Sequence, residues 1–124
     1  MLIEIDDTKT VADIQDRFSL CFPRLKIEFY KKPHGWEESS STKHLVEPDA
    51  FIGDIRKNHN PGILDIKSWY KTGEVEKLFK QLFGLNAQIF RMENNRWKQS
   101  IESDGLTLAM QTEIAMNVET RNPR

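Results

Sequence analysis

The sequence has one cysteine, scattered glycines and no long hydrophobic run, and each shortage excludes a class of protein. A single cysteine in 124 residues cannot form an intrachain disulfide, which argues against a small secreted disulfide scaffold. The six glycines form neither Gly-x-Gly-x-x-Gly nor Gly-Lys-Ser/Thr, so no phosphate-binding loop is predicted. No apolar stretch approaches the roughly 20 residues of a membrane-spanning helix. Because the first residues also lack the basic segment of a signal peptide, we expect a cytoplasmic protein.

The charge balance gives no general attraction to nucleic acid or to a membrane surface. The formal net charge is −1. The basic clusters at 24–32 and 56–59 are of the kind that is usual on a solvent-exposed protein surface. Neither nucleic acid nor membrane is therefore expected as a partner. Seven phenylalanines and three tryptophans supply enough bulky material for the core of one domain, which we place at 1–117.

A strand–helix–strand pattern occurs twice, at 2–30 and at 63–92. Each copy has an alternating apolar stretch, an amphipathic helical stretch and a second apolar strand. Two such units in tandem favour a sheet with both helices on one face. The matched residues are Ile3 with Leu64, Ile5 with Ile66, Phe18 with Phe79, and Ile27 with the strand around Ile89.

Local signals give the expected element boundaries. Thr10 can cap the first helix by accepting a hydrogen bond from the Asp13 amide, Gly84 suits the end of the second helix, and Thr107 can cap a third. Asp49 is expected to cap a short helical turn around Ile52. Strands are predicted at 2–6, 25–31, 63–69, 86–92 and 96–101, with a long connection at 31–62 and a disordered tail at 118–124.

The predicted fold is therefore α+β, a ferredoxin-like βαββαβ sandwich with an added C-terminal strand and helix. The main alternative is another α+β arrangement in which the fourth and fifth strands form a separate hairpin. In the sandwich, both helices cover one face of the sheet, and the other face must be polar or covered.

No residue pattern predicts a catalytic, metal or cofactor site. His34, His44 and His59 all fall in the long connection, and no two of them have the spacing that places ligands on one helix face. Cys21 lies on the apolar stripe near the end of the first helix, which is typical of a core residue rather than a nucleophile. No carboxylate is marked as a catalytic acid.

Aromatic residues on the open face of the predicted sheet point instead to protein contacts. Tryptophan, tyrosine and arginine are favoured anchors in protein interfaces. The C-terminal helix could equally fold over this face as an intramolecular lid. The expected anchors are Trp69, Arg91 and Trp97, with Tyr30 and Trp36 as secondary ones.

The stretch 83–91, followed by Trp97 and then by Asp104-Gly105-Leu106-Thr107-Leu108 with Gln111, resembles small bacterial proteins of unassigned function. The resemblance covers the C-terminal third, implies a bacterial, non-secreted accessory domain and carries no activity. The sequence thus predicts a non-enzymatic protein-interaction or self-association domain, whose partner is another protein or a second copy of itself in a homodimer. The alternative is a small-molecule- or metal-binding domain, or an enzyme, with its site under the 31–59 loop and with the three histidines as polar groups.

Overall fold

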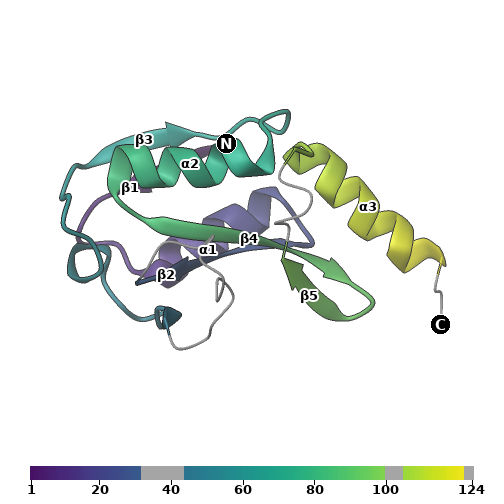
Figure 1. The fold of residues 1–124 in the computed structure, drawn as a ribbon, viewed down its shortest axis with the longest axis horizontal. Coiled ribbons are helices and arrows are strands. Elements are labelled where there is room, and N and C mark those ends of the chain that lie inside the picture. Colours follow the sequence, from purple (N-terminus) through teal and green to yellow (C-terminus); the bar gives the residue numbers. More distant parts are fainter. Residues whose placement is uncertain (32–43, 100–104, 122–124) are drawn as a thin grey trace.

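The computed structural model describes residues 1–31, 44–99 and 105–121, with side chains up to residue 117. Three α-helices, five strands and one short 3-10 helix are present in these ranges (Figure 1). In chain order they are β1 (Leu2–Ile5), α1 (Val11–Cys21), β2 (Leu25–Tyr30), η2 (Ile52–Asp54), β3 (Gly62–Asp65), α2 (Thr72–Phe83), β4 (Asn86–Glu93), β5 (Arg96–Gln99) and α3 (Leu108–Arg121).

The helices begin and end at the residues that local chemistry favours. The Asp13 amide donates to the Thr10 hydroxyl at 3.2 Å, and the Asp13 carboxylate accepts from the Thr10 amide at 2.9 Å, which confirms the predicted cap of α1. Gly84 follows α2 with a φ of 67°, a left-handed conformation that glycine adopts without steric cost. The Thr107 hydroxyl accepts from the Met110 amide at 3.1 Å at the start of α3.

The strands form two antiparallel sheets, and the α+β class is confirmed. β1 pairs with β3, and the second sheet has the order β2-β4-β5. The ferredoxin-like topology is not confirmed, because the described strands do not join into the single sheet expected from the sequence. The separate hairpin is not observed either, since β4 pairs with both β2 and β5.

The register of both sheets reproduces the internal repeat. Ile3 lies opposite Leu64 in the first sheet, and Ile27 lies opposite Ile89 in the second. These are the residues that the repeat matches, so the two strand–helix–strand units pair equivalent strands with each other.

One hydrophobic core joins both sheets and the first two helices. Phe18 of α1 and Phe79 of α2, which the repeat also matches, are both fully buried. The Phe79 ring meets Phe29 of β2 edge-on, with ring centroids 5.6 Å apart and an interplanar angle of 70°. Such contacts add about 0.5–1.5 kcal/mol to the burial of the rings themselves.

Several predicted boundaries were wrong in detail. β3 ends at Asp65 rather than at 69, so Trp69 lies in the turn before α2. Asp49 does not cap the helical turn, because the residue before η2 is Phe51 and no side chain caps it. The backbone of α3 is helical to Arg121, beyond the point at which a tail was expected. The predicted end of β5 lies outside the described residues.

The hairpin between β4 and β5 turns at Asn94 and Asn95. Their φ angles are 53° and 62°, as in the two-residue turns that match the twist of antiparallel strands. Among the helices in the described ranges, none combines the length and apolarity needed to cross a bilayer.

Replacing Gly84 by alanine should lower the free energy of unfolding by about 1–2 kcal/mol, because a side chain is strained at this positive φ. The added Cβ would also lie 3.1 Å from the Asn58 Cβ. Urea denaturation checks this. Gly105→Ala is the matched control, since a Cβ there meets nothing within 4 Å; equal midpoints for the two variants would contradict the prediction.

Candidate functional site

The predicted histidine site is not assembled in the described part of the chain. His34 lies outside the described residues. The His44 carbonyl accepts a backbone hydrogen bond from Lys31, and the His59 side chain pairs with Asp7. Within residues 1–31, 44–99 and 105–117, no three His, Cys, Asp or Glu side chains are arranged to hold a metal ion.

His59 belongs to a charged cluster built around Arg56. The Arg56 Nε and one terminal nitrogen donate to Asp7 Oδ1 at 3.1 and 2.8 Å, and His59 Nδ1 lies 2.8 Å from Asp7 Oδ2. The other terminal nitrogen donates to the carbonyls of Asn60 and Phe83. The Arg56 side chain is fully buried, and its bonds join the turn after β1, the segment before β3 and the end of α2. This arrangement is a structural clamp.

Tyr30 and Arg91, two of the expected anchors, are turned into the protein. Tyr30 is only 6% exposed. Burial and the nearby Glu28 charge raise the pKa of its hydroxyl to about 12, although a hydrogen bond from Gln99 opposes the shift. A side chain with so little accessible surface offers a partner almost no contact area.

Arg91 connects β4 to α3. Its side chain is 12% exposed and donates to Glu93 Oε2 at 3.2 and 2.8 Å, and this hydrogen bonding holds the pKa of the Glu93 carboxyl below its usual value. Arg91 also donates to the Gln111 side-chain oxygen, and the Gln111 amide donates to the Thr72 hydroxyl at 3.2 Å. α3 is therefore held against β4 and the start of α2 by a buried polar network.

The two tryptophans within the described residues remain exposed despite α3. Trp97 on β5 is 41% exposed and Trp69 is 67% exposed, so the terminal helix buries neither of them. Trp36, the fifth expected anchor, lies outside the described residues. Cys21, by contrast, is partly buried against the core, in agreement with its predicted structural role.

Trp97 is held on the sheet surface by a cation. The Lys26 ammonium lies 5.0 Å from the centre of the Trp97 ring and 5.0 Å from that of Phe90, and it also pairs with Glu28 at 3.0 Å. Beside this stack, the β4–β5 hairpin forms a groove of about 560 Å³. The groove is lined by Glu93, Asn94, Arg96, Trp97 and Lys98.

Trp69 stands on a different part of the molecule. It packs edge-on against Tyr70, with ring centroids 6.4 Å apart, and the Lys67 ammonium lies 6.0 Å from its ring centre. Lys67 in turn pairs with Asp65 of β3 at 2.7 Å. The two tryptophans therefore belong to separate surfaces, one beside each sheet.

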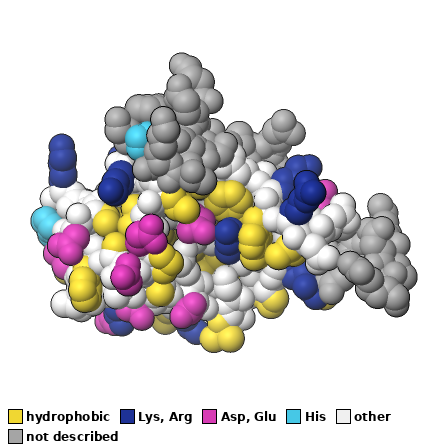
Figure 2. Space-filling view, turned by 90° about the horizontal axis from the view of Figure 1, so that it is seen from below, with side chains coloured by type: hydrophobic (Ala, Val, Ile, Leu, Met, Phe, Trp, Pro, Cys, Tyr) yellow, Lys and Arg dark blue, Asp and Glu magenta, His cyan; other side chains and the backbone are white. Residues whose placement is uncertain are grey.

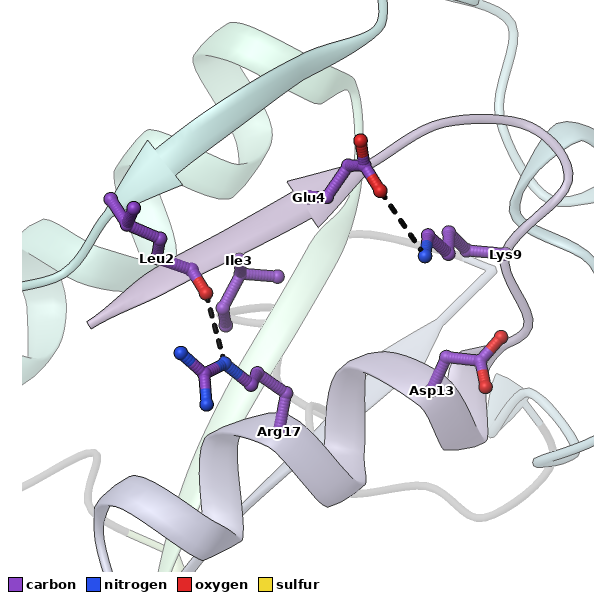
Figure 3. A pocket seen from close by; sticks show the side chains of 6 residues that line it. All are labelled: Leu2, Ile3, Glu4, Lys9, Asp13 and Arg17. Atoms are coloured by element: carbon purple, nitrogen blue, oxygen red, sulfur yellow. Dashed lines mark hydrogen bonds and ion pairs between the residues drawn. The ribbon is translucent and has the colours of Figure 1, made fainter.

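Sequence reasoning missed a groove between β1 and α1 (Figure 3). It measures about 380 Å³ and is lined by Leu2, Ile3, Glu4, Lys9, Asp13 and Arg17. Arg17 Nε donates to the Leu2 carbonyl at 3.0 Å, and Lys9 pairs with Glu4 at 3.3 Å. The one signal in the sequence was the helical spacing of Asp13 and Arg17 on the polar side of α1.

Hydrophobic side chains other than the two tryptophans are also exposed on the surface. Leu2 of β1 and Ile63 of β3 are both more than half exposed on the outer face of their sheet. Figure 2, which views the molecule from below, shows hydrophobic side chains lying among acidic ones over much of another face. The described surface thus offers apolar area on several sides.

Comparisons of the chain with protein-family models, with curated proteins and with solved structures found no match. The resemblance of the C-terminal third to small bacterial proteins stays a prediction. A function must therefore be argued from the surfaces described above.

Stability should depend on pH through the Asp7 carboxyl. Its hydrogen bonds from Arg56, with a smaller contribution from His59, hold its pKa below the usual value of 3.8. A carboxyl whose pKa is lower in the folded state than in the unfolded state stabilises the protein at any pH above its unfolded-state pKa. This stabilisation is lost as the pH falls from about 3.8 through the lower pKa of the folded state. Asp7→Asn should lose that part of the pH dependence in chemical denaturation between pH 2 and 6.

The matched control is Asp49→Asn, which removes an exposed carboxylate with no hydrogen bond or ion pair in the described residues. It should follow the wild-type pH profile. Identical profiles for Asp7→Asn and the wild type would contradict the prediction.

Proposed function

We propose that this chain is a non-enzymatic protein-interaction domain that docks through its exposed tryptophans. The observation that carries the proposal is the position of Trp97, 41% exposed on the edge strand β5 and stacked with Lys26. A large aromatic side chain that is held in place loses little conformational entropy when a partner covers it. Tryptophan is also one of the residue types that are enriched at binding hot spots.

The surroundings of Trp97 support this role. Among the described strands, β5 pairs with β4 alone, and an edge strand of this kind can offer its backbone groups to another chain. The adjoining hairpin groove supplies two basic groups, Arg96 and Lys98, and one acidic group, Glu93. An apolar centre with a polar, charged rim is the usual anatomy of a protein interface.

Trp69 is the second anchor of the proposal. It is the more exposed tryptophan, and its contacts with Tyr70 and Lys67 fix its orientation. Arg91 and Tyr30 take no part in the proposed contacts, because their side chains are engaged within the domain. The ferredoxin-like relationship and a bacterial accessory role remain compatible proposals, and neither is needed for this function.

Trp97→Ala should weaken partner binding by about 2 kcal/mol or more, as expected for a hot-spot tryptophan, and should leave the fold intact. The immobilised chain is incubated with its native lysate, and the proteins that it retains are identified. The affinity of the wild type and of each variant is then measured for each identified protein. Trp69→Ala tests the second anchor in the same way.

Leu82→Ala is the comparison variant, since Leu82 is also a large apolar residue with 46% exposure but lies on α2. It should retain the same proteins as the wild type. If both tryptophan variants keep the wild-type melting temperature and still retain the same proteins, the proposed docking surfaces are rejected.

A further inference from the structure

β5 carries different chemistry on its two faces. Successive side chains along a strand point to opposite faces, so Trp97 lies on one face and both Arg96 and Lys98 lie on the other. The register agrees, because Trp97 stands opposite Met92, whereas Arg96 stands opposite Glu93. Along its length, β5 therefore alternates cation, aromatic ring and cation.

The two cations of β5 are not balanced by the carboxylate beside them. Glu93 lines the hairpin groove together with both, but its Oε2 atom already accepts from Arg91 at 3.2 and 2.8 Å. Lys98 lies 3.9 Å from the other carboxylate oxygen, and Arg96 is exposed and has no ion pair within the described residues. Because Arg91 compensates the charge of Glu93, this face of β5 has positive charge in excess and attracts carboxylates.

The backbone of Trp97 is directed toward the edge of the sheet. The Met92 amide donates to the Arg24 carbonyl at 2.8 Å, on the β2 side of β4, so it does not point toward β5. In an antiparallel pair of this kind, both residues direct their N–H and C=O groups away from each other. Trp97 therefore presents one donor and one acceptor on the side of β5 where no described strand pairs with it (Figure 1).

We propose that the partner of the Trp97 surface is an extended segment of another protein that pairs with the edge of β5 and alternates acidic with apolar side chains. The inference rests on the proposed function, because it takes Trp97 as the anchor. An added strand places its side chains on the same two faces as the strand that it joins. Its apolar residue then covers Trp97, and the residues before and after it bring carboxylates to Arg96 and Lys98.

A protein segment suits this surface better than a nucleic acid does. A nucleic-acid backbone repeats its negative charge along a continuous basic track. The two cations here are confined to one face of a short strand, and the next side chain between them points to the opposite face. The backbone groups of Trp97 are also the partners that a β-strand uses.

Two peptides of the same composition test the alternation. One peptide of about eight residues, within the usual length of a strand, alternates glutamate with valine, and the other contains the same residues in like pairs. Both are titrated into the full chain by calorimetry. The alternating peptide should bind roughly tenfold more tightly or better, because it alone places every carboxylate on the cationic face. Added salt should weaken its binding.

A reversal of charge gives the decisive test. The double variant Arg96→Glu/Lys98→Glu should bind the glutamate–valine peptide roughly tenfold more weakly or worse, and should bind a lysine–valine peptide in its place. A misfolded protein would not exchange one specificity for the other, so the result separates binding from stability. Trp97→Ala should weaken both complexes, whereas Trp69→Ala should change neither.

Equal affinity for the alternating and the paired peptide, or no binding of either, would overturn the inference. A double variant that still prefers the acidic peptide, or a wild type that prefers a single-stranded oligonucleotide, would overturn it as well. If lysate proteins are retained through Trp97 but are indifferent to the charge reversal, the inference fails and the proposed function stands. If the peptides behave as expected but lysate proteins are retained without Trp97, the proposed function fails and the strand site stands.

Discussion

The structure depends on a core that neither sheet could bury by itself. β1 and β3 form only a two-stranded ribbon, and such a ribbon is marginal in water unless it packs against other elements. Here, the inner residues of both sheets and the apolar stripes of α1 and α2 meet in one cluster. The contact of Phe79 with Phe29 crosses between the two repeats and thereby joins them into one domain.

Sharing the core in this way determines which surfaces remain free. The ribbon has its inner face on the core and its outer face, with Leu2 and Ile63, in solvent. The second sheet receives α3 beside β4 through the network of Arg91, Gln111 and Thr72, so this region is closed. In the described part of the chain, Trp97 on β5 and Trp69 in the turn before α2 stay exposed, and the proposed docking uses these regions.

Polar groups divide into those that hold the fold and those that face outward. Arg56 and Arg91 are almost fully enclosed. Arg56 bonds to partners in distant segments, and Arg91 bonds to Glu93 on its own strand and to Gln111 of α3. Arg17 lies on the exposed side of α1 and uses one nitrogen on an edge carbonyl. This difference explains why Arg91, an expected interface anchor, proved to be a structural residue. A sequence shows that an arginine is present on a strand but does not show which acceptors surround it.

The sequence by itself determined the elements whose causes are local. The Thr10–Asp13 cap, the end of α2 at Gly84 and the stripe through Phe18 follow from residues within one or two turns, so they could be predicted. The internal repeat was also visible, and the register of Ile3 with Leu64 matches it. Only the tertiary structure decided how the strands pair, because pairing joins residues that are far apart in sequence and depends on the packing of the whole core. For the same reason, it alone decided that Tyr30 is buried and that Trp97 is exposed.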